Sequence, residues 1–167
     1  MSIQIARITK GQKQEFLNLY NLYLYDLSPF TGEDPKGGKF DPTNTYLYLE
    51  RAELHPFFIR HGDRNVGFIL VTSQPFVDEG IDYSIQELFL LKKYRGMSLA
   101  KLSVEQVLER FKGRVKVAQV KNNTAAVRFW NKFYKDHAID YSEHEEIIEA
   151  DGLAGQLPIL YQVFINR

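Results

Sequence analysis

The chain has 167 residues, of which 44% are hydrophobic, a size that suits one buried core and is short for two ordinary domains. We therefore expect a single domain over residues 1–167. Lys plus Arg equals Asp plus Glu at 21 each, so no overall charge draws the protein to nucleic acid or to an anionic membrane. Cysteine is absent, which excludes a disulfide framework and a thiol nucleophile.

The sequence also argues against a metal site and a membrane span. The histidines, which are His55, His61, His137 and His144, show no paired ligand spacing. The first residues lack the basic start and apolar stretch of a signal peptide, and no apolar run approaches the ~20 residues that a bilayer needs. We expect a cytoplasmic protein without a metal.

The first third of the chain predicts a strand over residues 3–8 and a strong helix from about Gly11. Apolar side chains at spacings of three and four give this helix one buried stripe, made of Phe16, Leu19, Tyr20, Tyr23, Leu24 and Leu27. Ser28-Pro29 is expected to end the helix. A long loop then covers residues 28–45, and the pattern over residues 43–53 slightly favours a short helix.

The rest of the chain alternates strands and helices. A hairpin is predicted over residues 56–72, with its turn at 61–65. The elements expected after it are a strand over 82–91, a helix over 98–111, a strand from 115, a helix from 123, and closing strands over 139–148 and 157–165, joined by a loop at 151–156. This order predicts an α/β (α+β) protein, with a mixed sheet that carries helices on both faces.

The segment over residues 85–100 is the most informative part of the chain. Its apolar run breaks at Lys92 and Lys93, passes Arg95-Gly96 and opens directly into an amphipathic helix. A strand that ends in a tight turn aims the unpaired N–H groups of the next helix outward, which suits a pyrophosphate. The glycine spacing is that of neither a dinucleotide fingerprint nor a P-loop.

The turn resembles the acyl-CoA pyrophosphate loop of the GNAT superfamily of N-acetyltransferases. That loop reads Gln or Arg, two residues, Gly, one residue, then Gly or Ala. Here Lys93 stands at the first position, Gly96 at the glycine, and Ser98 at the last position, so two positions depart from the pattern. Ser98 is small, and we expect its hydroxyl to cap the helix. Taken alone, the loop suits CoA binding and an ordinary strand-to-helix connection equally.

A second motif follows at the spacing that this family shows. GNAT proteins carry Asn, two residues, Ala, two residues, Phe or Leu, then Tyr, one residue and Lys after the fifth strand. The residues that match are Asn123, Ala126, Phe129 and Lys132, with Trp130 in the Tyr position. The resemblance implies the GNAT fold, a mostly antiparallel sheet of about six or seven strands. The chain also resembles a bacterial group of predicted acetyltransferases that carry Phe-Trp in this motif.

The resemblance implies acetyl-CoA as co-substrate and assigns its contacts. The implied cofactor-binding residues are Phe89, Leu90, Leu91, Arg95, Gly96, Met97, Ser98, Leu99, Ala100, Asn123, Phe129 and Trp130. Backbone groups of Phe89, Leu90 and Leu91 would hold pantetheine and the acetyl oxygen. For Trp130 a plain packing role stays open, and for Phe133 it is the simpler interpretation.

The catalytic hypotheses concern one carboxylate and one phenol. Glu87 lies in mid-strand on the face of Phe89 and Leu91, where desolvation would raise its pKa toward that of a general base. Binding a cationic substrate or pairing with an arginine explains it equally well. Because Trp130 cannot donate a proton as a tyrosine does, either Tyr134 is the general acid or the thiolate leaves by way of water.

Three functions remain open. The leading hypothesis is an N-acetyltransferase that moves acetyl from acetyl-CoA to a primary amine of a small molecule. The second is modification of a protein or peptide amine, and the third is a catalytically degenerate CoA-binding protein, for which Trp130 and Ser98 argue. Aromatic and acidic residues near the first helix, which are Tyr20, Tyr23, Tyr25, Tyr46, Tyr48, Asp26, Glu33 and Asp34, are either core and solvated groups or the receptor of a cationic amine. Exposed closing strands would suit a homodimer.

Overall fold

The computed structural model describes residues 2–149 and 155–167. In this part of the chain the strands are β1 (Ile3–Arg7), β2 (Leu54–His61), β3 (Arg64–Ser73), β4 (Tyr83–Leu90), β5 (Gly113–Val120), β6 (Ser142–Ile148) and β7 (Leu157–Asn166). The α-helices are α1 (Lys13–Thr31), α2 (Leu99–Arg110) and α3 (Thr124–Asp136), and short 3-10 helices are η1 (Lys10–Gln12), η2 (Thr45–Leu49) and η3 (Lys92–Tyr94). Most of the expected loop at 151–156 lies outside the described residues.

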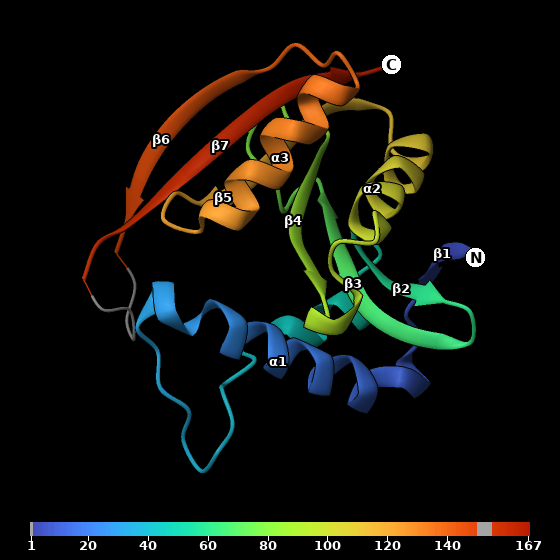
Figure 1. Cartoon of the computed structure of the whole chain (residues 1–167), viewed down its shortest axis with the longest axis vertical. Coiled ribbons are helices and arrows are strands. Elements are labelled where there is room, and N and C mark those ends of the chain that lie inside the picture. Colours follow the sequence, from blue (N-terminus) through green and yellow to red (C-terminus); the bar gives the residue numbers. More distant parts are fainter. Residues whose placement is uncertain (1, 150–154) are drawn as a thin grey trace.

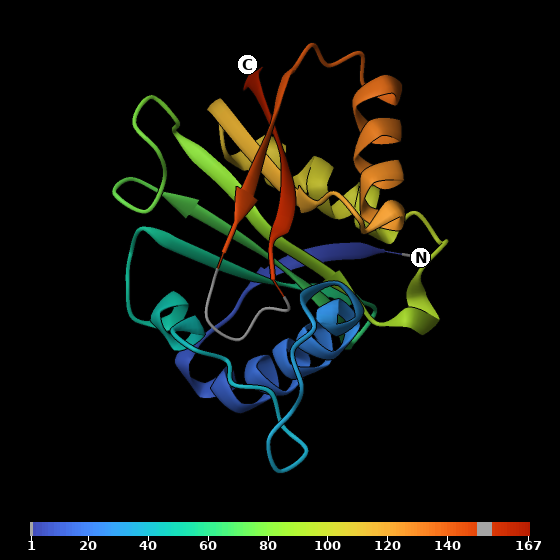
Figure 2. The same cartoon turned by 90° about the vertical axis from the view of Figure 1, so that its left-hand side faces the viewer.

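The strands form one sheet of seven in the order β1-β2-β3-β4-β5-β7-β6. β4 and β5 run parallel, and the other neighbouring pairs in this order are antiparallel. The edge formed by β6 and β7 lies beside α3, far from β1 (Figure 1 and Figure 2). The prediction of a mixed, mostly antiparallel sheet with helices on both faces is confirmed.

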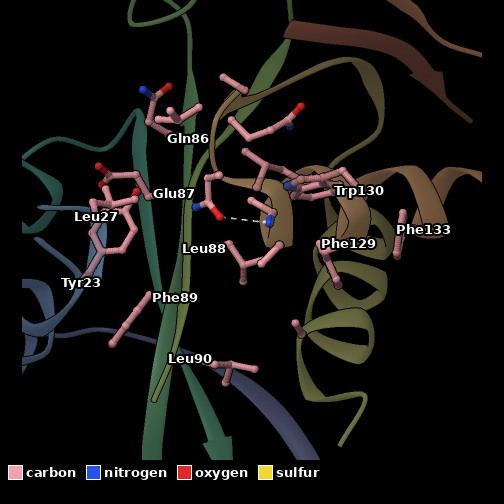
Figure 3. Close-up of a pocket in the computed structure, with 18 of the residues that line it drawn as sticks. Tyr23, Leu27, Gln86, Glu87, Leu88, Phe89, Leu90, Phe129, Trp130 and Phe133 are labelled. Carbon is pink, nitrogen blue, oxygen red and sulfur yellow. Dashed lines mark hydrogen bonds between the residues drawn. The ribbon is translucent and has the colours of Figure 1, made fainter. Parts of the chain in front are cut away.

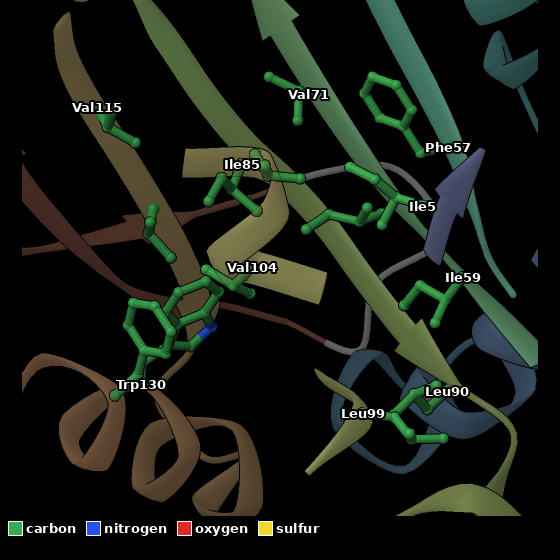
Figure 4. Close-up of a cluster of buried hydrophobic side chains, with 14 of the residues drawn as sticks. Ile5, Phe57, Ile59, Val71, Ile85, Leu90, Leu99, Val104, Val115 and Trp130 are labelled. Carbon is green, nitrogen blue, oxygen red and sulfur yellow. The ribbon is translucent and has the colours of Figure 1, made fainter. Parts of the chain in front are cut away.

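Each face of the sheet has its own core. On the face covered by α2 and α3, aliphatic strand residues such as Val71 and Ile85 pack against Val104 and Trp130 (Figure 4). On the face covered by α1, the core is mainly aromatic, with Phe16 of the helix against Phe68 of β3. The strands of the sheet centre are buried on both sides, which explains their nearly continuous apolar sequences.

The end of α1 differs from the prediction, because the helix continues through Ser28 and Pro29 to Thr31. Proline removes the N–H that would bond to the carbonyl four residues earlier, which here belongs to Tyr25. The Ser28 hydroxyl donates to that carbonyl at 2.6 Å and replaces the lost bond. The helix ends instead at Gly32, whose φ of 73° is the left-handed conformation of a helix C-terminus.

The remaining elements lie close to their predicted positions. The hairpin of β2 and β3 turns at Gly62, and the ambiguous segment after the long loop contains the short helix η2. No helix of residues 2–149 or 155–167 is long and apolar enough to span a bilayer. The same residues contain no cluster of three or more His, Cys, Asp or Glu side chains suited to a metal ion.

Candidate active site

The sheet opens between β4 and β5. The two strands pair over only three residues each, Tyr83 to Ile85 on β4 and Val115 to Val117 on β5. Beyond these pairs the strands separate, and a cleft of about 890 Å³ lies between them, bounded by α1, the start of α2, and α3. Glu87 and Phe89 point toward α1, while Leu88 and Leu90 point to the side of the sheet that carries α2 and α3 (Figure 3). The cleft therefore has one wall from each face of the sheet.

The gap leaves backbone groups of β4 without a strand partner. The Leu91 N–H donates to the Val66 carbonyl of β3 at 2.9 Å, and the Leu91 carbonyl accepts from the Tyr94 N–H. Successive residues of a strand direct their N–H groups to opposite sides. The Phe89 N–H therefore faces β3, as that of Leu91 does, whereas the N–H groups of Leu88 and Leu90 face the cleft. The prediction that Leu91 supplies backbone contacts is wrong because its groups are already bonded, and the N–H that faces the cleft belongs to Leu88 rather than to Phe89.

The turn after β4 presents amides to the same cleft. Gly96 has a φ of 79°, and a side chain there would meet no heavy atom within 4 Å. Ser98 also has a positive φ, 62°, and makes no side-chain hydrogen bond to the helix that follows. The expectation that Ser98 caps α2 is therefore wrong, since its left-handed backbone turns the hydroxyl away. The first amides of α2, at Leu99 and Ala100, have no side-chain cap and line the cleft.

Arg95 supports this turn through its side chain. Its Nε donates to the Leu90 carbonyl at 3.0 Å, and its Nη2 lies 2.9 Å from Asp26 Oδ2 on α1. The guanidinium also lies 5.8 Å from the Phe89 ring centre. These contacts connect the turn to α1. The Arg95 guanidinium is paired with Asp26, so its main role is to stabilise the turn. Met97 is 43% exposed and does not line the cleft.

Helix α3 forms the wall opposite α1. The Asn123 side chain accepts from the Ala126 N–H at 3.2 Å and caps the helix, as its position predicts. Phe129 and Trp130 line the cleft, and their rings lie 5.1 Å apart, nearly perpendicular. Trp130 is only 4% exposed and belongs to the core, as does Phe133. Trp130 therefore packs and lines the cleft at the same time.

A β-bulge aims Glu87. Val71 of β3 pairs with Ile85 and the adjacent Leu70 pairs with Glu87, so Gln86 is an extra residue. Ile85 consequently faces the α2 and α3 core, whereas Glu87, two residues later, faces α1. The Tyr20 hydroxyl of α1 donates to Glu87 Oε1 at 2.8 Å.

Burial raises the pKa of the Glu87 carboxyl to about 7, and the hydrogen bond from Tyr20 opposes that rise. Burial and the nearby Glu87 charge also raise the pKa of the Tyr20, Tyr23 and Tyr48 hydroxyls far above their ordinary value. The three phenols are therefore neutral at any physiological pH. Glu87 is the titratable group of this cluster that changes charge near pH 7, the property of a general base.

Tyr134 lies outside the cleft. It is 1% exposed, and its hydroxyl donates to Gln162 Oε1 of β7 at 3.1 Å. Its ring packs between Tyr141 and Phe164. Burial, followed by the nearby Tyr141 and Glu143, raises the pKa of this phenol further. The prediction that Tyr134 is the general acid is wrong, because the side chain at that helical spacing faces the core.

Comparison with known proteins decides the family. The model described as the acetyltransferase (GNAT) family matches residues 16–134, which include the turn after β4 and most of α1 and α3. This chain belongs to the GNAT acetyltransferase family. The suspected resemblance and the expected activity class, an acyl-CoA-dependent N-acyltransferase, are thereby confirmed. No curated protein matches the sequence.

Solved structures share the fold of this GNAT protein at low sequence identity. The smu.2055 protein of Streptococcus mutans covers 100% of both chains, with a TM-score of 0.70 and 16% identity. Arabidopsis thaliana NAA60 in complex with a bisubstrate analogue covers 99% of this chain and 100% of its own, with a TM-score of 0.65 and 12% identity. A GNAT acetyltransferase from Elizabethkingia anophelis with acetyl-CoA bound covers 98% and 97%, with a TM-score of 0.60 and 12% identity.

Side chains that the motifs do not include complete the lining of the GNAT cleft. Leu27 and Thr31 of α1, Phe76 of the loop before β4, and Lys116 and Tyr161 of the distal strands line it. The Lys116 ammonium bonds to Asp78 and lies 4.2 Å from the Tyr161 ring centre. No sequence motif marks these residues, although the two-residue period of β5 and β7 could have placed Lys116 and Tyr161 on one face.

The acidic and aromatic residues near α1 divide into several groups. Tyr20 belongs to the core beside α1, with Tyr23 and Tyr48 packed against it, and Tyr23 also lines the cleft. Asp26 lines the cleft but is paired with Arg95. The remaining residues, Tyr25, Glu33, Asp34 and Tyr46, do not line it.

Proposed function

We propose that this enzyme transfers an acetyl group from acetyl-CoA to a primary amine of a small molecule by direct attack. The observation that carries the proposal is the juxtaposition, in one cleft, of strand and helix amides that face the ligand space and a partly buried carboxyl with a pKa of about 7. A polar main-chain surface suits the thioester and phosphates of the donor. A base that is half ionised near neutral pH suits the acceptor.

The donor would lie across the opening of the sheet. Its pyrophosphate would accept hydrogen bonds from the amides of Gly96, Ser98, Leu99 and Ala100, where the positive end of the α2 dipole favours an anion. Its pantetheine arm would pair with the Leu88 backbone and the Leu90 N–H, since the Leu90 carbonyl already accepts from Arg95 Nε. The arm would then lie between β4 on one side and Phe129 and Trp130 on the other. The structure from Elizabethkingia anophelis, which holds acetyl-CoA, supports this choice of donor.

The chemistry follows from these positions. The ammonium group of the acceptor gives a proton to the ionised Glu87, and the neutral nitrogen attacks the thioester carbonyl carbon. A new C–N bond forms as the carbonyl π bond opens, and the resulting oxyanion is stabilised by a β4 amide that faces the cleft. The intermediate collapses when the C–S bond breaks, which gives the acetylated amine and the CoA thiolate.

The thiolate takes its proton without a dedicated phenol. Trp130 stands at the position of the usual tyrosine, and the Tyr134 hydroxyl is buried against Gln162. A thiol with a pKa of about 8.5 is a good leaving group near neutral pH, so the barrier for its departure needs little help from an acid. We propose that a proton from the attacking nitrogen reaches the sulfur through water.

A protein or peptide amine is the second candidate. The similarity in fold to Arabidopsis thaliana NAA60, solved with a bisubstrate analogue, indicates that a fold of this kind can hold donor and acceptor groups together. The side chains at the acceptor end include an apolar wall and the paired charges of Lys116 and Asp78, an arrangement that suits a small molecule with an apolar part. A homodimer, a cytoplasmic location and a single domain over the whole chain stay predictions.

Two measurements test the proposal in sequence. Titration calorimetry with acetyl-CoA should show saturable binding, with one site per chain. Acetyl transfer should then be assayed against a panel of small primary amines and a panel of short peptides with free N-termini. Turnover of amines and not of peptides supports the small-molecule acceptor, and the reverse supports the second candidate. Absence of acetyl-CoA binding by correctly folded protein would overturn both, and binding without any turnover would favour the degenerate protein.

A further inference from the structure

We propose that Tyr20 is a positioning residue that fixes the Glu87 carboxylate for catalysis, by occupying one carboxyl oxygen and leaving the other for the substrate amine. This inference rests on the proposed function, because it concerns how the proposed base is held. Tyr20 lies on α1 and Glu87 on β4, 67 positions apart in the chain. The sequence motifs of the family do not include Tyr20.

The geometry gives the two carboxyl oxygens different surroundings. Oε1 accepts the hydrogen bond from the Tyr20 hydroxyl at 2.8 Å. Oε2 has no hydrogen-bond partner among the described residues, and the Glu87 side chain lines the cleft. A charge-assisted hydrogen bond of this length fixes the orientation of the carboxylate group about its terminal C–C bond. The free oxygen is therefore the one that an amine in the cleft would meet.

Tyr20 is itself held rigidly. It is 7% exposed, and its ring lies within 6.2 Å of three aromatic neighbours, centre to centre. These neighbours are Phe16, Tyr23 and Phe68. A phenol packed in this way loses little further freedom when it donates to Glu87, so the hydrogen bond is preorganised.

The surroundings of Glu87 make this hydrogen bond matter. The titratable groups that face Glu87 are Tyr20 and Tyr23 from α1 and Tyr48 from η2, and β3 places the apolar Leu70 opposite it. Burial favours the protonated carboxyl, and the donor from Tyr20 favours the carboxylate. Without that donor the pKa of Glu87 would rise above about 7, so a smaller fraction of the enzyme would hold an ionised base at neutral pH.

The test is the pH profile of a Tyr20→Phe variant, which removes one oxygen and keeps the ring. In the wild type, kcat/KM for the amine should rise with pH through the titration of Glu87. In Tyr20→Phe the rising limb should move upward by about one pH unit, because a hydrogen bond to a charged group shifts a titration by about that amount. The rate should fall several-fold at pH 7 and recover at higher pH. A uniform loss at every pH would indicate a purely structural role and overturn the proposal.

Tyr48→Phe is the matched control. Its hydroxyl also lies near Glu87 and is buried, but within the described residues it donates no hydrogen bond to that carboxyl. We expect its rising limb to stay at the wild-type pH. Equal shifts in the two variants would show that loss of any buried hydroxyl is sufficient, and the specific role of Tyr20 would be refuted.

A second measurement does not depend on turnover. The carboxyl carbon of Glu87, labelled with ¹³C, should titrate at higher pH in Tyr20→Phe than in the wild type, in protein without substrates. If the titration moves but neither protein transfers acetyl, the contact is real and the proposed function fails. If acetyl transfer is normal and neither the titration nor the profile moves, the proposed function stands and the role of Tyr20 fails.

Discussion

At the proposed donor half of the cleft, the groups that would face a ligand belong mainly to the main chain, whereas at the proposed acceptor half they belong to side chains. The proposed donor half would use amides of Leu88 and Leu90 and of the turn at Gly96, where Ser98 departs from the family pattern. The proposed acceptor half would use Glu87 and other side chains that line the same cleft, including those of Phe76 and Tyr161. A surface of amides can serve one donor in many proteins, while side chains can change with the acceptor.

This comparison predicts that substitutions can change the reaction rate and the affinity for acetyl-CoA separately. Changes at Glu87 should reduce the rate and leave donor affinity intact, and changes at the turn should do the reverse. The predictions below begin with the largest expected effect.

Glu87→Gln should reduce kcat by about 10²- to 10⁴-fold, the usual contribution of a general base, while the Kd for acetyl-CoA stays within about two-fold. The amide keeps the size of the side chain and a carbonyl oxygen for Tyr20, so the cleft should keep its shape. Steady-state kinetics and calorimetry measure the two quantities. Glu109→Gln on the exposed side of α2 is the control and should change neither. An unchanged rate at saturating amine would remove Glu87 from the mechanism.

Gly96→Asp should weaken acetyl-CoA binding at least about tenfold, because it places a negative charge beside the proposed pyrophosphate site, at a cost of about 1.4 kcal/mol or more. Gly62→Asp is the matched control, since Gly62 has a similar φ, 64° against 79°, and equally open space around it, but lies in the β2–β3 turn. Both variants should lose similar stability in urea. Calorimetry should find normal binding in the control, and equal losses of affinity would contradict the assigned site.

Ser98→Gly should stabilise the protein by about 1 kcal/mol, because glycine adopts the left-handed backbone at this position without the cost of a Cβ atom. Ser98→Ala should be nearly neutral, since the hydroxyl makes no capping bond. Urea unfolding measures both differences. Destabilisation by alanine similar in size to a lost cap would show that the serine hydroxyl bonds to α2 after all.

Tyr134→Phe should leave kcat and its pH dependence unchanged, because the hydroxyl bonds to Gln162 away from the cleft. A loss of stability of about 1 kcal/mol or less is expected, since Gln119 still donates to the same Gln162 oxygen at 2.9 Å. Tyr141→Phe, on the ring that packs beside Tyr134, should behave in the same way. A selective fall in kcat for Tyr134→Phe would return this phenol to the list of proton donors.

The two halves also differed in how far the sequence predicted them. The donor half depends on short spacings around Gly96 and Asn123, which the chain shows directly, and the opening of the sheet follows from the family fold. The contact between Tyr20 and Glu87 spans 67 positions and depends on a β-bulge at Gln86 that appears only when β3 and β4 pair. Tyr20 in the buried stripe of α1 does indicate that such a contact exists, because a buried phenol needs a hydrogen-bond partner, but it does not identify Glu87 as that partner.

The errors in the prediction have local physical causes. Pro29 was expected to end α1, but the neighbouring Ser28 hydroxyl supplies the bond that proline cannot make. Ser98 was expected to cap α2, but its backbone is left-handed. The spacing that places Tyr134 one turn after Trp130 is compatible with the cleft or with the core, and only the packing of β7 decides between them.

The short pairing of β4 with β5 has a consequence for the life of the enzyme in the cell. In the proposed binding mode, the pantetheine arm would bond to the exposed edge of β4 as a substitute strand, so the ligand would complete a sheet that the polypeptide leaves unfinished. Binding of this kind stabilises only the folded state and grows with the ratio of free ligand to Kd. The abundance of the enzyme should therefore follow the supply of acetyl-CoA, and starvation for that metabolite should expose the chain to proteolysis.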